Sequence, residues 1–506
     1  MRGPQDAGRR LWTALIVAAA VFAAWESARY TLAGGRRGRF HVEGPYFIMV
    51  GLAVLLVLLF SRRRKESARV GPVGRLERSA WVLVACTAWA LLLYWPSLTL
   101  GFLSDDFVLV DRAQRGHALD LAPGGFWRPL PHWVLGLLGT RPAILHLVNV
   151  LLHGTNGWLV ARLARSLALG PRAAVFSGFL FISFPASVEA VAWCSGLQDV
   201  LMTTAVLAGI SIWGEPWPLK GRMLACLFAL CVAVATKEAG VVLAVLGLIV
   251  WCGRFSWREI VAIATPSAVA AAAYSVWRLW QLPLPDGYAQ FPTRFIAKEL
   301  LARSFGGLSV PYHTDLAAFG VALALASGIA IPLLIATNAL IWRDDREAFQ
   351  RFLRAALFVV IAVVPVYRYF HMASNLEGSR YFYLPSAGGA ILLVTLAATG
   401  STRIRVNRTA QATVGVLVIM VWATVVRIHL IPWVEASVLR DETIRAATIA
   451  LASGGCGPGS SFQDVPDSVR GAYVFRNGFP EALAEHVPLT GTPCDLHWID
   501  GSFVSR

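Results

Sequence analysis

Two adjacent carboxylates, Asp105 and Asp106, follow directly after a long apolar run, in the stretch GFLSDDFVLV. Such a pair can solvate a turn, cap a short helix through Ser104 or Asp105, or act as a general base. A general base has to lie within hydrogen-bond reach of the group that it deprotonates. The residues that the rest of the chain brings to the same place therefore decide between these alternatives.

Basic side chains occur in three other polar stretches. Arg128 lies in WRPL, Lys237 precedes Glu238 in ATKEAG, and Arg380 follows Glu377 by three residues in NLEGSRYFYLPS. Arginine suits bidentate recognition of a phosphate, and lysine supplies a point charge. For Lys237 and Glu238 the alternative is a pair at the membrane surface, and for Arg380 it is a salt bridge with Glu377 within the loop.

Further polar residues lie within or beside apolar segments. In LHLVNVLLHGTNGW four of them recur at helical spacing and share one helical face: His146, Asn149, His153 and Asn156. Inside a span such residues face either a partner helix or a substrate cavity, and both interpretations stay open. Glu189 in FPASVEAVAW and Asp199 in SGLQDV are expected near the membrane surface, either as ion-pair partners or as part of a site.

Long apolar segments must position these residues. Of the 506 residues, 56% are hydrophobic and only 15% are charged, and the mean hydropathy is +0.59. A helix needs about 20 apolar residues to cross a bilayer. The pattern predicts an all-α polytopic membrane protein with about thirteen transmembrane helices, over residues 11–33, 45–61, 79–99, 142–165, 173–192, 197–214, 221–236, 238–253, 257–279, 316–342, 355–370, 382–399 and 410–431.

The basic residues predict the orientation of these spans. The net charge is +15, which in a soluble protein suggests nucleic acid as a partner. Here the basic residues gather in alternate short loops, above all in residues 62–78, so we expect those loops and the N-terminus to be cytoplasmic and expect no nucleic acid. Asp105, Asp106 and the C-terminal segment then lie outside, and only the arginines of residues 36–39 disagree.

Three regions follow from this organisation. Residues 1–78 hold two spans and a basic cytoplasmic loop, residues 79–432 form the main membrane domain, and residues 433–506 form a small extracytoplasmic C-terminal domain. Cys456 and Cys494 both lie in this last region, where an oxidising compartment favours a disulfide between them. The chain shows no closed set of metal ligands, so a divalent metal is permitted but not indicated.

Carboxylates and cations on one outer face suit one kind of chemistry. A hydroxyl acceptor must lose its proton as it attacks, so a carboxylate would serve as general base. A departing lipid phosphate gains negative charge, which arginine or lysine would stabilise. The set therefore predicts group transfer from a phosphorylated lipid that stays in the bilayer.

The ordered blocks SDDF, WRPL, LHLVNVLLH, FPASVEAVAW, KEAG and EGSRYFYLPS resemble the membrane half of the transmembrane and tetratricopeptide-repeat O-mannosyltransferases and their bacterial relatives. The resemblance covers roughly residues 79–400. It implies a GT-C fold, a polyprenyl-phosphate sugar as donor and an Asp-Asp pair in an external loop. Unlike the family, this chain has Phe184 before Pro185 where His is frequent, has Leu197 where Arg is frequent, and shows no 34-residue repeat after its last span. These departures concern the choice of acceptor and sugar.

Carried over residue by residue, the resemblance implies that Asp105 and Asp106 are the catalytic pair. Of the two we favour Asp105 as the base, with Asp106 positioning the acceptor or the loop. The resemblance also implies that Arg128, Lys237 and Arg380 bind the donor phosphate. We expect the cavity between these two groups to be lined by His146, Asn149, His153, Glu189, Asp199, Glu238, Glu377 and Tyr383.

The expected activity is an inverting transfer of a sugar to a hydroxyl of a protein or glycan acceptor, on the outer face of a bacterial cytoplasmic membrane. The expected partners are the lipid-linked sugar, its acceptor and the bilayer, with no cofactor indicated. A secondary transporter or lipid flippase is the alternative. Such proteins often show two similar halves with interrupted helices, and no internal repeat is visible here. A membrane scaffold would explain neither the aspartates nor the cations.

Overall fold

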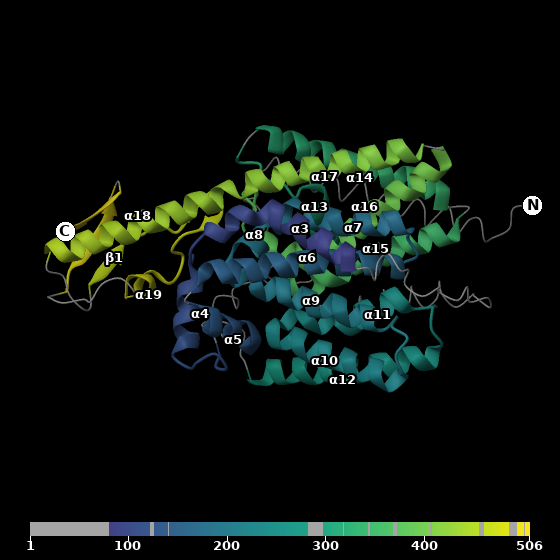
Figure 1. Cartoon of the computed structure of the whole chain (residues 1–506), viewed down its shortest axis with the longest axis horizontal. Helices are drawn as coiled ribbons and strands as arrows, with labels where there is room; N and C mark the ends of the chain where they lie inside the picture. The colour runs from purple at the N-terminus through teal and green to yellow at the C-terminus, as the bar shows by residue number, and fades with distance from the viewer. Residues whose placement is uncertain are drawn as a thin grey trace, which may run out of the picture.

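The computed structural model describes residues 80–121, 126–139, 141–281, 297–316, 318–342, 345–367, 372–404, 407–454, 460–484, 493–499 and 501–505. These residues are mostly helical, with short strands near the C-terminal end (Figure 1). Among them, nine helices are long and apolar enough to cross a membrane, or ten if one bent pair counts as a single span. The prediction of an all-α polytopic membrane protein is confirmed, while predicted spans 11–33 and 45–61 lie outside the described residues.

Helix α6 (Pro142–Ser166) occupies the centre of the bundle. It packs against α3 (Ala80–Tyr94), which continues as η1 (Trp95–Thr99), and against α7 (Pro171–Ile182) and α9 (Leu197–Ile212). A Cβ atom added to Gly178 would lie 2.4 Å from the carbonyl oxygen of Gly157, so glycine is required where α6 and α7 approach most closely. The central position of α6 explains why its polar face meets other helices.

The span predicted over residues 173–192 is bent by 47°. Helix α7 ends at Ile182 and is followed by the short helices η2 (Pro185–Ser187), α8 (Val188–Ala192) and η3 (Cys194–Gly196). Pro185 has no backbone N–H and disfavours helical backbone at Phe184, so the helix cannot run through this point. The bend turns the residues from Glu189 to Ser195 toward one end of the bundle.

A second interruption falls at Lys237. Helix α10 (Leu219–Thr236) ends there, Lys237 adopts an extended backbone with φ −158°, and the chain resumes as η4 (Glu238–Val242) and α11 (Leu243–Trp251). The separation of the apolar runs 221–236 and 238–253 in the sequence corresponds to this break. Helix α12 (Trp257–Gln281) packs against both α10 and α11.

The remaining membrane helices are α14 (Ala318–Trp342), α15 (Arg346–Val363) with η6 (Val364–Val366), η7 (Ser379–Phe382) with α16 (Tyr383–Ile404), and α17 (Arg408–His429). Helix α15 begins at Arg346 rather than at residue 355, because the Asp345 carboxylate accepts hydrogen bonds from the backbone N–H groups of Glu347 and Ala348. A further helix, α13 (Ala297–Ser309), is too short to be a span and was not predicted from the sequence.

The C-terminal region starts with a helix. Helix α18 (Ile431–Gly454) follows α17 and projects beyond the end of the bundle at which α4 (Asp105–Gln114) and α5 (Pro129–Leu138) lie (Figure 1). Residues 433–454 of the predicted C-terminal domain are therefore helical.

Short strands and one helix accompany α18. Strand β4 (Asp495–Ile499) pairs in parallel with β1 (Ser461–Gln463) and antiparallel with β5 (Ser502–Ser505), with Leu496 opposite Ser505. Strands β2 (Ser468–Val469) and β3 (Ala472–Tyr473) form a separate antiparallel pair. Helix α19 (Phe479–Ala484) packs against α4, so this region contacts the stretch that contains the two aspartates.

Candidate functional site

The two adjacent aspartates open helix α4. Ser104 immediately before them has φ +51°, a left-handed backbone conformation that is uncommon outside glycine. Its hydroxyl makes no capping hydrogen bond to the first turn of α4 and instead accepts one from the backbone N–H of Asn477, at 3.3 Å. The turn before α4 is thus held from the C-terminal region, and helix capping by Ser104 does not account for it.

Asp106 is completely buried. One carboxylate oxygen accepts a hydrogen bond from the Leu103 N–H at 3.0 Å, and the other accepts from the Ser195 N–H at 2.8 Å and the Ser195 hydroxyl at 2.5 Å. Burial raises the pKa of Asp106 to about 7, against the lowering effect of these three donors. Asp106 therefore ties the start of α4 to η3.

Asp105 differs from its neighbour because it is partly exposed. Its Oδ1 accepts a hydrogen bond from Nδ2 of Asn477 at 2.6 Å, and among the described residues none donates to its Oδ2. Of the two carboxylates, Asp105 is the one that a substrate can reach.

Arg128 reaches α9 and η4 from the start of α5. Its Nε and Nη2 donate to the two carboxylate oxygens of Glu238 at 3.0 and 2.6 Å, which is the bidentate arrangement that favours arginine. Its Nη1 donates to Gln198. Arg128 thus holds together three segments that are far apart in sequence.

Lys237 and Arg380 form two further ion pairs, of which only the Lys237 pair is buried on both sides. Lys237 donates to Asp199 at 2.5 Å, and both side chains are more than nine-tenths buried. The Arg380 guanidinium lies 3.5 Å from Glu189, which also accepts hydrogen bonds from the backbone N–H of Arg380 and the hydroxyl of Ser379. Each predicted cation is therefore matched by one of the predicted carboxylates.

Aromatic rings connect the cations to the aspartate turn. The Lys237 ammonium lies 4.9 Å and the Arg380 guanidinium 5.3 Å from the centre of the Tyr381 ring. Arg380 also lies 4.6 Å from the ring of Trp193, whose indole N–H donates to the Leu103 carbonyl at 3.0 Å. Since Leu103 also donates to Asp106, Trp193 bridges the cation cluster and the acid pair.

Glu377 has a different partner from the one considered in the sequence. The salt bridge with Arg380 within the loop is not formed, because Arg380 pairs with Glu189 and Glu377 pairs with Arg476 at 2.7 Å. Leu376 and Gly378 have φ values of +61° and +81°. These left-handed residues turn the loop so that Glu377 faces the C-terminal region.

The polar face of α6 forms a seam of hydrogen bonds between helices. The residues that it joins are fully or almost fully buried: His146, Asn149, His153, Asn156 and Tyr383. The His153 Nε2 lies 3.0 Å from the Ile182 carbonyl and must donate to it, so Nδ1 accepts from the Tyr383 hydroxyl at 2.7 Å. Asn149 donates to the Trp193 carbonyl, and the His146 ring contacts the Cys194 thiol.

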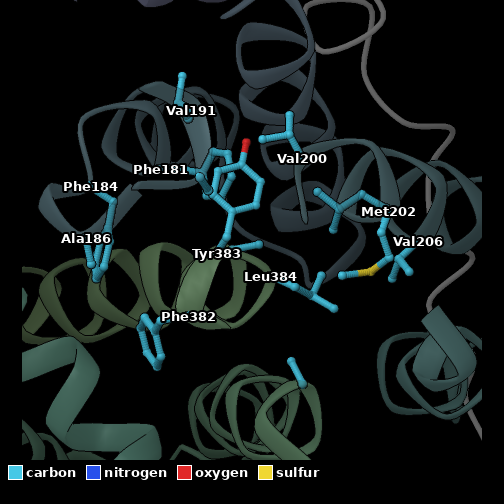
Figure 2. Close-up of a cluster of buried hydrophobic side chains, with 14 of the residues drawn as sticks. Phe181, Phe184, Ala186, Val191, Val200, Met202, Val206, Phe382, Tyr383 and Leu384 are labelled. Carbon is cyan, nitrogen blue, oxygen red and sulfur yellow. The ribbon is translucent and has the colours of Figure 1, made fainter. Parts of the chain in front are cut away.

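Figure 2 shows Tyr383 among the apolar side chains of Phe181, Val200 and Leu384, with its hydroxyl at the edge of this cluster. The side chains of His146, Asn149, His153 and Tyr383 are at most 1% exposed, so their neighbours close them off in this structure. This burial favours the interhelical alternative, and the lining of a substrate cavity by these residues stays a prediction.

Several residues of this region were not predicted individually. Trp193 and Tyr381 lie inside the quoted blocks, so their aromatic character close to the charged residues was an available signal. Ser195 and Asn477 carry no such signal, since single small polar residues occur throughout the chain. Cys494 is disulfide-bonded, and its predicted partner Cys456 lies outside the described residues. Among the described residues, no three His, Cys, Asp or Glu side chains are grouped as metal ligands would be.

The fold and these contacts define a polytopic membrane protein with a polar, ion-paired site at one end of its helical bundle. No protein-family model matches the chain. Over 141 residues it is 33% identical to "Protein O-mannosyl-transferase Tmtc1" of Drosophila melanogaster, a match that covers 23% of this chain and 16% of that protein. The resemblance to O-mannosyltransferases that the ordered blocks indicate is confirmed for this stretch.

A solved structure is also similar: the archaeal oligosaccharyltransferase AglB from Archaeoglobus fulgidus, in complex with an inhibitory peptide and a dolichol-phosphate. The superposition covers 72% of this chain and 57% of that chain, with a TM-score of 0.39 and 12% sequence identity.

Proposed function

We propose that this chain is a membrane glycosyltransferase of the GT-C type that moves a sugar from a polyprenyl-phosphate donor to a hydroxyl acceptor, with inversion at the anomeric carbon. The observation that carries the proposal is the position of the partly exposed Asp105 at the end of the bundle that also holds three ion-paired cations. Asp106, Ser195 and Trp193 connect the two groups through hydrogen bonds and a ring contact.

The two aspartates have separate roles in this proposal. Asp105 is the general base, because it is accessible and its Oδ2 is left without a donor by the described residues. Asp106 is a positioning residue, because it is buried and its oxygens are occupied by Leu103 and Ser195. A base must hydrogen-bond to the proton that it removes, which Asp106 cannot do in this arrangement.

In the proposed step the acceptor oxygen forms a bond to the anomeric carbon of the sugar while its proton passes to Asp105. The bond between the anomeric carbon and the phosphate oxygen breaks, and the polyprenyl phosphate leaves with the electron pair. A single displacement of this kind inverts the anomeric centre. One carboxylate acting on the acceptor is sufficient for it, since no covalent sugar–enzyme intermediate is formed.

Arg128, Lys237 and Arg380 stabilise the phosphate as it gains charge. Because each is already paired with a carboxylate, they act as an ordered and nearly neutral set of dipoles rather than as an excess of positive charge. Glu189, Asp199 and Glu238 hold the three cations in place at the border of the site. Glu377 pairs with Arg476 of the C-terminal region there. We place the site on the outer face of a bacterial cytoplasmic membrane, where a protein or glycan hydroxyl is the acceptor.

The experiment uses purified protein, radiolabelled polyprenyl-phosphate sugars, and peptide or glycan acceptors. Asp105→Asn is expected to lower the transfer rate by about 10²–10⁴-fold, the usual contribution of a general base. Asp111→Asn is the matched control, because Asp111 lies on the same helix and forms an exposed pair with Arg115. Transfer by Asp105→Asn at the control's rate would contradict the role of Asp105. Movement of the labelled lipid across vesicles without any sugar transfer would favour the flippase alternative.

A further inference from the structure

Residues 473–478, here called the tail segment, lie directly against the turn that carries the acid pair. The Ser104 N–H donates to the Val474 carbonyl at 2.9 Å, and Phe475 stacks on Phe107 with ring centres 6.0 Å apart. Val474 is completely buried. The tail segment is therefore a packed wall of the site and not a loosely attached terminus.

Gly478 allows this close approach. Its φ is +85°, and a Cβ atom there would lie 2.6 Å from the Ser104 carbonyl oxygen and 3.0 Å from the Phe107 Cβ. Any other residue would be strained in this backbone conformation and would also push the tail segment away from the turn before α4. The backbone thus fixes the position of Asn477 relative to Asp105.

Three acidic residues from distant parts of the membrane domain each accept a hydrogen bond from the tail segment. The Tyr473 hydroxyl donates to Glu189 at 3.1 Å, Arg476 donates to Glu377 at 2.7 Å, and Asn477 donates to Asp105 at 2.6 Å. These acceptors lie on α8, on the loop before η7 and at the start of α4. One stretch of six residues therefore touches both the acid pair and the surroundings of Arg380.

We propose that the tail segment completes the active site and that Asn477 is a positioning residue for Asp105. This inference rests on the proposed function. The Asn477 amide occupies Oδ1 of Asp105 and leaves Oδ2 directed to the acceptor hydroxyl. Because the amide is neutral, it orients the carboxylate without neutralising it, which a lysine or arginine in the same place would do.

The test compares Asn477→Ala and Asn477→Asp with the wild type and with Ser468→Ala. Ser468 lies exposed in β2, and its hydroxyl donates to Asp467 rather than to Asp105 or Asp106. It is therefore the control for substitution in the C-terminal region. Asn477→Asp keeps the size of the side chain while losing the donor, so it separates loss of orientation from loss of packing.

For Asn477→Ala we expect kcat to fall by roughly tenfold to a hundredfold, as for loss of a hydrogen bond to a charged group, with KM for the acceptor nearly unchanged. Asn477→Asp should lower kcat at least as far, since a second carboxylate at this separation repels the charge of Asp105 instead of donating to it. In an Asp105→Asn background, Asn477→Ala should have no further effect on residual transfer.

A variant that folds as the wild type does and keeps kcat would overturn the positioning role. A loss of activity that appears only as a higher KM would also overturn it, because the tail segment would then contact the acceptor without orienting Asp105. If Asp105→Asn itself retains activity, the proposed function fails first, so the two failures are distinguishable.

Discussion

The acid pair (Asp105 and Asp106) and the cation cluster (Arg128, Lys237 and Arg380) lie at the same end of the bundle. They differ in the charge of the groups that contact them. Among the described residues, the donors to Asp105 and Asp106 are all neutral and come from Asn477, Leu103 and Ser195. Arg128, Lys237 and Arg380 are each paired with a carboxylate. Neutral donors preserve the negative charge that a base needs, whereas ion pairing allows cations to be buried without an excess of charge.

The two kinds of contact also differ in how much each contributes to the stability of the fold. A neutral hydrogen bond contributes about 1 kcal/mol to stability, whereas breaking a buried ion pair by removing one partner costs several times more. Substitutions among the cations should therefore disturb the fold, while substitutions around the aspartates should mainly disturb the geometry of the site. The following predictions test this difference, beginning with the largest effect.

Lys237→Met should have the largest effect on stability. It leaves Asp199 buried without its partner, which should lower the apparent free energy of unfolding by about 3–5 kcal/mol. Thermal unfolding in detergent measures this loss. Arg115→Ala, which removes only an exposed pair with Asp111, should cost less than about 1 kcal/mol and serves as the control.

Combining Lys237→Met with Asp199→Leu should restore most of the stability, because an apolar pair can replace a buried ion pair without loss. It should not restore sugar transfer, since the cation is still missing. If the double variant regains activity, Lys237 has only a structural role.

Asp106→Ala should have an intermediate effect on stability. It leaves the Leu103 N–H, the Ser195 N–H and the Ser195 hydroxyl without an acceptor, at a cost of about 1–3 kcal/mol for a buried unsatisfied group, and about 3 kcal/mol in total is expected. Asp106→Asn keeps one acceptor oxygen and should cost less. Thermal unfolding and amide exchange over residues 101–107 measure the effect, and unchanged exchange in Asp106→Ala would show that the turn before α4 is not held through this side chain.

The pH dependence of stability that comes from Asp106 should be smaller than the effects of Lys237→Met and Asp106→Ala. Burial raises the pKa of Asp106 to about 7 from an ordinary value of 3.8. Between these two values the folded protein binds the proton that the unfolded chain has released, so this group makes the protein less stable as the pH rises. From pH 5 to pH 7 the contribution is a loss of about 2 kcal/mol.

Asp106→Asn cannot titrate at this position and should lack this part of the slope. The difference between the two proteins in thermal stability across pH 5–7 isolates the effect from all other groups. Parallel curves would mean that Asp106 is ionised throughout, held so by its three donors.

The sequence predicted the membrane helices better than the bends and contacts between them, for a physical reason. Most apolar spans were found because bilayer crossing imposes a minimum length on each, and the break at Lys237 was visible because a charge interrupts two apolar runs. The 47° bend after α7 was missed, although Pro185 marks it, since apolar composition continues across the bend. The polar face of α6 was recognised, but hydropathy does not distinguish a partner helix from a cavity.

For the site, the types of residue were predicted more readily than their partners. Arg128 and Glu238, 110 residues apart, were both selected as charges at apolar borders, yet nothing local indicates that they bind one another. Asn477 lies 372 residues beyond Asp105 and belongs to a part of the chain outside the resemblance. Its role could not be inferred before the tail segment was seen against α4.

By itself, the sequence determined that this chain forms a bundle of membrane helices and which charged residues must avoid lipid, because the cost of exposing charge to hydrocarbon acts on each residue separately. Only the tertiary structure decided which charges neutralise one another, which aspartate stays accessible, and that the C-terminal region closes over it. Those outcomes depend on distances between atoms that folding alone brings together.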